Sequence, residues 1–267
     1  MSGRAVALGD PSPWHGGTVT AHATCVLAPN PSPMTLDGTN TWLVRSGRDV
    51  LVVDPGPDDP AHLDAIVAEV DGAHVARILL THGHPDHSEG AVALAGRLHA
   101  AVLALDPAHR LGDEGLVGGD VVVVGDVALS VVPTPGHTDD SLSFHLPVDG
   151  ALLTGDTVLG RGSTVIAHPE GRLADYLASL RRLRDLAESS EAAVVLPGHG
   201  PALVDPAGAV SAYLAHREQR LEQVRAALAS GARTADEVVE IVYADVPRDL
   251  WPAARLSVLA QLDYLRA

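Results

Sequence analysis

The run Thr81-His82-Gly83-His84-Pro85-Asp86-His87 decides the fold, because it places four potential metal ligands within six residues. It follows directly on Ile78–Leu80, an apolar stretch with the composition of a short buried strand. Gly83 and Pro85 favour a turning loop over a helix, so the side chains can converge. Neutral imidazole and carboxylate groups are the ligands that zinc-like divalent metals accept. The run therefore predicts a metal site at the end of a strand.

Three further ligand-type residues occupy the same kind of position. His137, Asp156 and His199 each follow an apolar strand candidate and a glycine that permits a sharp turn. Taken singly, either histidine would be structural, and Asp156 would be a turn or helix-capping residue. Strand ends collect at one edge of an α/β sheet, so convergence of all four segments is the economical explanation. The predicted ligands are His82, His84, Asp86, His87, His137, Asp156 and His199.

The organisation along the chain predicts one main domain with a helical appendage. Residues 1–17 form an N-terminal lead-in, and residues 18–205 alternate short apolar strands with helices, as expected of a catalytic α/β domain. Residues 206–267 carry only helical periodicity and form a C-terminal subdomain, or else pack as extra helices of the main domain. Within this tail, Thr234 and Glu237 have the spacing of a helix-capping box.

Composition limits the setting and the partners. Hydrophobic residues make up 46% and aromatic residues 3% of the 267 residues, so Val, Leu and Ala must fill the core. The net charge is −16, which disfavours a general nucleic-acid binder, although bound metals would reverse the local sign. The single cysteine, Cys25, fits a reducing, cytoplasmic protein, and no apolar run is long enough to predict a membrane span.

These motifs, together with Leu51-Val52-Val53-Asp54-Pro55-Gly56, resemble the motif series of the metallo-β-lactamase superfamily over about residues 20–205. The resemblance implies an α/β fold, an αββα sandwich with the site at the shared sheet edge, followed by a winged-helix-like helical subdomain. It also implies that Asp54 supports the ligand loop without touching metal. By the same resemblance, one metal is held by His82, His84 and His137, a second by Asp86, His87 and His199, and Asp156 bridges the two.

Other segments narrow the branch. True β-lactamases of this fold usually carry Cys where Asp156 stands, which disfavours antibiotic hydrolysis. The segments Met34–Leu43, Arg217–Arg220 and Trp251–Ala254 resemble the lactamase-beta-2-like hydrolases, a branch that includes an endoribonuclease of single-stranded RNA. That branch has a winged-helix-like tail, but no wing strands follow the last helix here, which weakens a nucleic-acid role for the tail.

The predicted activity is that of a dinuclear metal-dependent hydrolase. Two cations about 3.5–4 Å apart can share a water and lower its pKa towards about 7, which gives a metal-bound hydroxide at neutral pH. Asp86 is the predicted catalytic residue, since its carboxylate can orient that hydroxide and move its proton. Two divalent ions are expected, with Zn²⁺ the best match to nitrogen and oxygen ligands and Mn²⁺ or Fe also tolerated.

Two substrate classes remain open at this stage. One is single-stranded RNA, cleaved by an endoribonuclease-like phosphodiesterase, with arginines between 161 and 184 meeting phosphates unless they line a solvated helix face. The other is a small acyl thioester or ester, hydrolysed as by glyoxalase II relatives; scarce aromatics favour it, although nothing in the sequence resembles a basic glutathione pocket. A metal-binding module without catalysis is a third class. The candidates for substrate contact are Asn40, Ser163 and Thr164.

Overall fold

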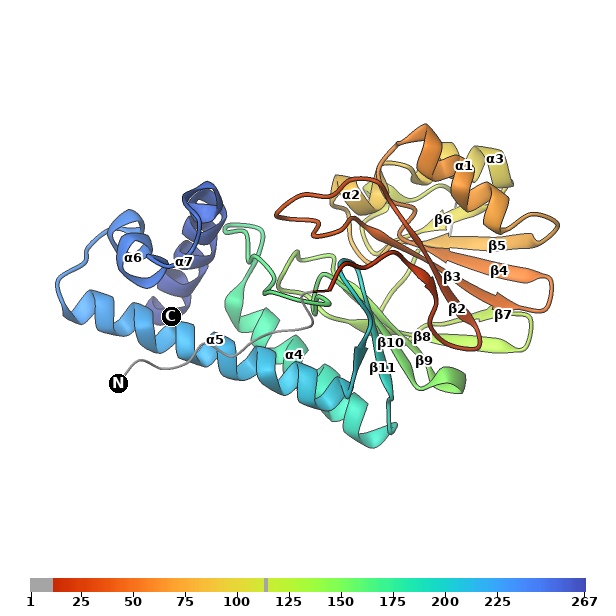
Figure 1. Cartoon of the computed structure of the whole chain (residues 1–267). Coiled ribbons are helices and arrows are strands. Elements are labelled where there is room, and N and C mark those ends of the chain that lie inside the picture. Colours follow the sequence, from red (N-terminus) through yellow and green to blue (C-terminus); the bar gives the residue numbers. More distant parts are fainter. Residues whose placement is uncertain (1–11, 113–114) are drawn as a thin grey trace.

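A computed structural model describes residues 12–112 and 115–267 of the chain (Figure 1). Of the predicted lead-in, residues 1–11 lie outside the described residues. The first strand, β1 (Gly17–Thr18), begins at the last residue of the lead-in and pairs antiparallel with β2. No helix of the described ranges is both long enough and apolar enough to cross a membrane.

Two six-stranded sheets form the centre of the molecule. The first sheet has its strands in sequence order, and only its β4–β5 and β5–β6 pairs are parallel; its strands are β1, β2 (Ala23–Leu27), β3 (Asn40–Ser46), β4 (Asp49–Val53), β5 (His74–Leu79) and β6 (Ala101–Leu103). The second sheet has the order β12-β11-β10-β9-β8-β7, with only β10–β11 parallel. Its strands are β7 (Val121–Val124), β8 (Val127–Pro133), β9 (Leu142–Leu146), β10 (Ala151–Gly155), β11 (Val194–Pro197) and β12 (Leu203–Val204).

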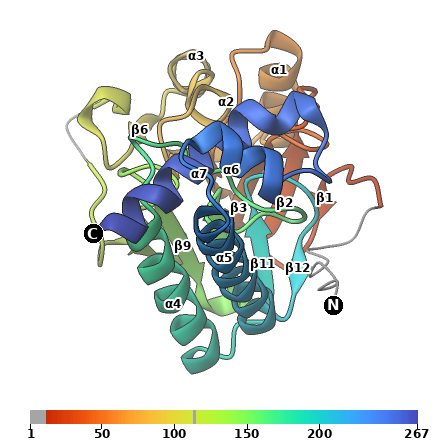
Figure 2. The same cartoon turned by 90° about the vertical axis from the view of Figure 1, so that its left-hand side faces the viewer.

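Helices cover the outer face of each sheet. In Figure 1, α1 and α3 lie over the first sheet, and α4 and α5 lie on the opposite side of the molecule. Figure 2 shows α4 and α5 side by side, with α6 and α7 beyond them. The helices are α1 (Pro60–Glu69), α2 (Pro85–Ser88), α3 (Ala91–Leu98), α4 (Leu173–Ser189), α5 (Pro206–Ala229), α6 (Ala235–Val242) and α7 (Trp251–Arg266), with 3₁₀ turns at Pro107–His109, Pro147–Asp149 and Arg248–Leu250.

The alternation of side chains along each strand explains these layers. Successive strand residues point to opposite faces, so Leu51 and Val53 enter the core between the sheets while Val50 and Val52 face α1 and α3. Both sets are fully buried, which is why β4 is a continuous apolar run. The αββα sandwich predicted from the resemblance is therefore confirmed.

Helix α5 joins the sandwich to the C-terminal helices. Its first half, including Val210 and Tyr213, belongs to a buried cluster with α4 and β11. Its second half, including Val224, packs with Val238 of α6 and Val258 of α7. Because one continuous helix contributes to both clusters, a boundary between residues 205 and 206 stays a prediction. The predicted capping box at the start of α6 is present.

One local prediction was wrong. The segment after His84 is a short helix, α2, and not an open loop. Pro85 occupies its first turn, where a proline costs no hydrogen bond and its fixed φ suits the helix. The loop therefore comprises only Thr81 to His84. Helix α2 follows it and directs Asp86 and His87 back towards the strand ends.

The core between the sheets should be sensitive to truncation. Phe144 on β9 is 0% exposed, so Phe144→Ala should lower the free energy of unfolding by about 3–5 kcal/mol. Val123→Ala on the edge strand β7, where the side chain is 60% exposed, should change it by less than about 0.5 kcal/mol. Urea unfolding of both variants is the measurement, and equal losses would contradict this account of the core.

Candidate metal centre

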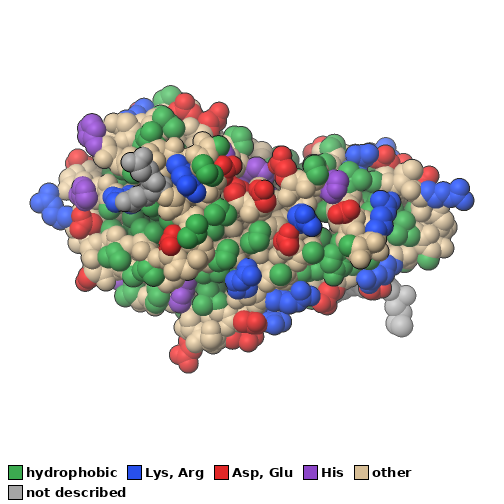
Figure 3. All heavy atoms as spheres, turned by 180° about the vertical axis from the view of Figure 1, so that it is seen from behind, with side chains coloured by type: hydrophobic (Ala, Val, Ile, Leu, Met, Phe, Trp, Pro, Cys, Tyr) green, Lys and Arg blue, Asp and Glu red, His purple; other side chains and the backbone are tan. Residues whose placement is uncertain are grey.

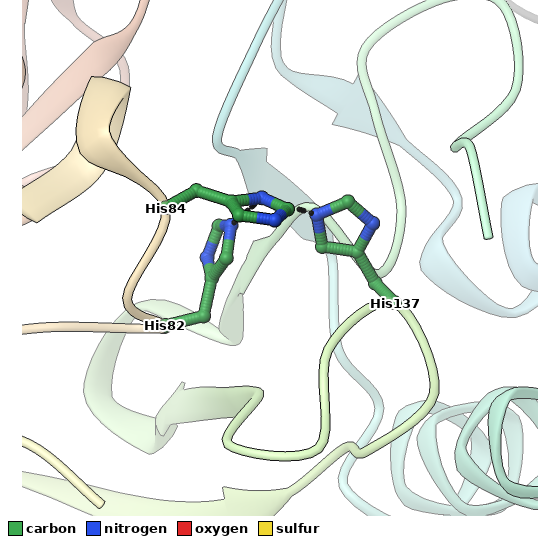
Figure 4. A group of neighbouring side chains, drawn as sticks. All are labelled: His82, His84 and His137. Atoms are coloured by element: carbon green, nitrogen blue, oxygen red, sulfur yellow. Dashed lines mark hydrogen bonds between the residues drawn. The ribbon is translucent and has the colours of Figure 1, made fainter. Parts of the chain in front are cut away.

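Three histidines from two separate loops converge at one end of the sandwich. Figure 4 shows the rings of His82, His84 and His137 pointing towards one another. His84 Nδ1 lies 3.0 Å from His82 Nε2 and 3.0 Å from His137 Nε2. For metal–nitrogen bonds of about 2.0–2.1 Å, tetrahedral ligands lie about 3.3 Å apart, so these three nitrogens can share one cation.

A second group forms beside the first. His87 Nε2 lies 3.2 Å from His199 Nε2, and Asp86 Oδ2 lies 3.2 Å from the same His199 nitrogen. One ligand atom from each residue falls within 4.8 Å of the others, so this set can also hold a metal. The seven predicted ligands therefore come together, although their role as ligands stays a prediction.

Asp156 lies between the two groups. Its Oδ2 is 3.4 Å from His199 Nε2 and 3.7 Å from His137 Nε2, and its Oδ1 is 3.4 Å from His87 Nε2. That Oδ1 is buried and has no hydrogen-bond partner among the described residues. A buried carboxylate oxygen left without a partner is costly, and a bridging position between two cations would satisfy it. The donor set thus fits two divalent metals.

Asp54 holds the ligand loop in place through hydrogen bonds to its carboxylate. It follows β4 and adopts φ 53°, which turns its carboxylate towards the ligand loop. Its Oδ2 accepts hydrogen bonds from His87 Nδ1 at 2.9 Å and from Thr81 Oγ1 at 2.7 Å, while its Oδ1 accepts from Thr81 N at 2.7 Å. These bonds leave His87 Nε2 directed at the site, as expected for an outer carboxylate that orients a ligand.

Backbone carbonyls orient two other histidines. Val165 O lies 2.8 Å from His137 Nδ1, and Gly38 O lies 3.1 Å from His199 Nδ1. Each of these hydrogen bonds places the ring proton on Nδ1. The Nε2 atom is then unprotonated, and its lone pair is free to bind a metal. Sequence reasoning missed both partners, because a backbone carbonyl has no sequence signal.

Two of the glycines before the ligands are needed for space. Gly136 has φ 133°, and a Cβ there would lie 2.3 Å from the backbone of Tyr176 on α4. A Cβ on Gly198 would lie 2.5 Å from Asp156 Oδ1. The glycines therefore let strand ends and α4 approach closely, beyond the sharp turns that the sequence predicted.

The carboxylates of Asp86, Asp156 and Asp54 set the pKa values of the histidines around them. Burial would raise the pKa of Asp86, but the hydrogen bond from His199 and the charge of His87 lower that pKa to about 2. Burial would lower the pKa of His199, but Asp156 and Asp86 raise it to about 9, and Asp156 and Asp54 likewise raise the pKa of His87. Metal ions and these histidine protons thus compete for the same negative charge. Burial and neighbouring histidines lower the pKa of His82.

The three predicted substrate contacts lie at different depths. Asn40 is fully buried, and its Nδ2 donates to the carbonyls of Pro197 and Gly200, so it holds the loop that carries His199. Thr164 is also buried, and its hydroxyl donates to the carbonyl of Asp156. Ser163 is exposed beside them. Only Ser163 therefore has a side chain open to solvent.

The arginines proposed to meet phosphates do not form a track. Arg161 pairs with Asp37, and Arg184 pairs with Asp185, its own neighbour. Arg182 donates to a backbone carbonyl. In Figure 3, acidic side chains gather around a histidine in the upper middle of the face shown, and arginine side chains lie scattered over the rest of it.

A histidine outside the predicted ligand set also contacts the support of the site. His62 on α1 is 2% exposed, and its Nε2 lies 2.9 Å from Thr41 Oγ1. Thr41 in turn donates to the carbonyl of Asp54. His62 therefore contacts, through Thr41, the backbone turn at Asp54.

Comparison with known families agrees with the geometry. The model of the metallo-beta-lactamase superfamily matches residues 34–199, and the chain belongs to this superfamily. The model of the beta-lactamase associated winged helix domain matches residues 234–267. As a member of the metallo-beta-lactamase superfamily, the protein is a hydrolase.

Individual relatives cover nearly the whole chain. A beta-lactamase-like protein 2 homolog of Drosophila melanogaster is 31% identical, over 92% of this chain and 88% of its own length. An atrochrysone carboxyl ACP thioesterase of Aspergillus chevalieri is 34% identical, over 87% of this chain and 76% of its own length. The crystal structure of a beta-lactamase domain protein from Burkholderia ambifaria, 26% identical, superposes with a TM-score of 0.81 over 96% of this chain and 90% of that one.

Metal affinity should rise with pH. His87 and His199 have raised pKa values and must lose their protons to bind a cation, so acid favours the protonated, non-binding form. Apparent Zn²⁺ affinity should increase between about pH 6 and about pH 8, by up to about tenfold per pH unit for each proton displaced. Calorimetry in buffers of different ionisation enthalpy counts these protons. His199→Gln should release fewer, and an unchanged count would contradict the assignment.

The Asp54 carboxylate should tune metal affinity without touching the metal. Asp54→Asn keeps a residue that tolerates positive φ, but its amide NH₂ must face one of the donors from Thr81 or His87. Metal affinity, measured by chelator competition, should fall by about 10–100-fold. Asp49→Asn is the matched control, because Asp49 also bonds a histidine Nδ1, that of His74, but at the exposed surface. Equal affinity in both variants would refute the role of Asp54.

Proposed function

We propose that this chain hydrolyses the carboxylic thioester of a small acyl substrate. The observation that carries the proposal is the site itself: a His/Asp cluster for two cations with one carboxylate, Asp86, at its open side. The Asp86 side chain is 31% exposed, whereas those of His87 and Asp156 are 0% and 12% exposed. The thioesterase from Aspergillus chevalieri, which is similar over most of this chain, supports thioester as the substrate class.

The residues divide the work of hydrolysis. Two divalent cations bound here would supply a water of lowered pKa and withdraw charge from the carbonyl oxygen. Asp86 stays ionised because its pKa is about 2, so its carboxylate accepts a hydrogen bond from the attacking water and orients it. The water oxygen forms a C–O bond to the carbonyl carbon, and the C–S bond then breaks as the thiolate leaves. The thiolate takes up one proton of the water, and the other is released to solvent when the carboxylic acid ionises, so the products are a carboxylate, a thiol and a proton.

Single-stranded RNA, the other predicted substrate, has less support from the structure. Three of the arginines after Asp156 bond groups of the protein itself: Arg161 pairs with Asp37, Arg184 with Asp185, and Arg182 donates to a backbone carbonyl. The described part of the tail, residues 206–267, contains helices only. We therefore treat RNA cleavage as an outcome of the test.

Turnover of two substrates by the Zn²⁺-loaded protein tests the proposal. An acyl thioester of N-acetylcysteamine should be hydrolysed, and Asp86→Ala should lower its kcat by at least about a hundredfold. Asp64→Ala is the matched control, because Asp64 is an exposed carboxylate on α1 paired with Arg97. Cleavage of a labelled single-stranded RNA that Asp86→Ala abolishes, with no thioester hydrolysis, would overturn the thioester proposal.

A further inference from the structure

A cavity lies beside Thr164 and Val165, whose hydroxyl and carbonyl groups contact Asp156 and His137. Its volume is about 170 Å³, and it is lined by residues 163–165, by the loop at Met34, and by α5 and α7. In Figure 1, the segment between β10 and α4 runs between the sandwich and the C-terminal helices. The cavity is large enough for one charged group and a short chain, but too small for a whole drug-sized ligand.

The cavity is joined to the metal centre on two sides. On one side, Thr164 donates its hydroxyl to the carbonyl of Asp156, and Val165 O bonds His137. On the other side, Met34 belongs to the loop that reaches Gly38, whose carbonyl bonds His199. Residues that line the cavity, or lie in the same loops, are therefore hydrogen-bonded to residues of the metal centre, so the two sites are neighbours.

The lining is cationic. Arg217 and Arg220 stand three residues apart on α5 and face the cavity together with His216. Among the described residues that line it there is no aspartate or glutamate, in a chain whose net charge is −16. Burial lowers the pKa of His216 to about 4, and the positive charges of Arg217 and Arg220 act in the same direction.

Arg217 is the least expected of these residues. It is only 3% exposed, and among the described residues no carboxylate pairs with it. Its Nη2 donates to Thr164 O, and its guanidinium lies 5.0 Å from the centre of the Tyr176 ring. Its buried Nε has no hydrogen-bond partner in the described part of the chain. A buried cation without a counter-charge is strongly unfavourable, so an anion that enters the cavity would relieve that cost.

Arg220 provides a second, more accessible cation. Its Nη1 donates to Val242 O and Gln223 Oε1, and the guanidinium stacks 4.6 Å from the centre of the Tyr243 ring. This stacking fixes the plane of the guanidinium, and its remaining N–H groups suit a planar or tetrahedral oxyanion.

We propose that this cavity binds an oxyanion of the substrate, a carboxylate or a phosphate, with Arg217 and Arg220 as its ligands. The proposal deepens the proposed thioesterase function and rests on it for the identity of the rest of the substrate. It supplies the basic pocket that the sequence did not show. The specificity that follows is for thioesters carrying a negative charge at a distance from the reacting carbonyl.

Paired thioesters locate the charge. Glutaryl- and pentanoyl-N-acetylcysteamine differ by a carboxylate on the acyl side, and pentanoyl-phosphopantetheine adds a phosphate on the thiol side. Arg220→Gln should raise KM at least about tenfold for whichever anionic substrate uses the cavity, and less than about twofold for the neutral one. The exposed Arg225→Gln on the same helix is the control, since Arg225 pairs with Glu222 away from the cavity. An equal loss on the neutral thioester would show a structural role and overturn the proposal.

Binding without turnover separates this proposal from the proposed function. Affinities for glutarate and for inorganic phosphate are measured by calorimetry on the metal-loaded protein, in the wild type, Arg220→Gln, Arg217→Gln and Arg225→Gln. We expect Arg220→Gln and Arg217→Gln, but not Arg225→Gln, to bind one of the two anions at least about tenfold more weakly than the wild type. That result supports anion binding in the cavity even if no thioester is hydrolysed. Unchanged binding of both anions in Arg220→Gln refutes it, even if thioesters are good substrates.

Discussion

The negative charge of Asp54, Asp86 and Asp156, buried to different depths at one end of the sandwich, is the constraint on which the site depends. Carboxylates removed from water must be paired, and the histidines around them are their partners. Burial and these carboxylates together set the raised pKa values of His87 and His199. Because Asp156 Oδ1 still has no hydrogen-bond partner among the described residues, histidines alone do not satisfy the group. Two divalent cations would balance the remaining negative charge. Hydrogen bonds to the Nδ1 atoms of His87, His137 and His199 hold these rings in the orientation that such cations need.

That firmness comes from the sheets. Each ligand segment leaves a buried strand, and its direction is set by apolar side chains that cannot shift without opening the core. Outer contacts then fix the rings: Asp54 for His87, and backbone carbonyls for His137 and His199. Preorganised nitrogens lose little entropy on binding a metal, so the stability of the sandwich contributes directly to metal affinity.

Sequence reasoning reached the fold and the ligand cluster because both have local signals. The His-x-His-x-Asp-His spacing and the glycines before His137, Asp156 and His199 each act within a few residues. It failed where the cause is tertiary. Nothing local to His62 shows that Thr41 and the Asp54 turn would bury it. Pro85 was taken as a sign of a loop, yet a proline fits the first turn of a helix equally well.

The cationic cavity is a stronger example of the same limit. Arg217 and Arg220 have the spacing of an ordinary solvated helix face, and only the packing of α5 against residues 163–165 and α7 encloses them. Their enclosure also resolves the conflict between an acidic chain and an anionic substrate. A net charge of −16 repels anions at long range, but fields in a low-dielectric cleft are dominated by the nearest charges. Among the described lining residues, Arg217 and Arg220 have no carboxylate beside them, so they would attract an anionic group into the cavity although the chain as a whole is acidic.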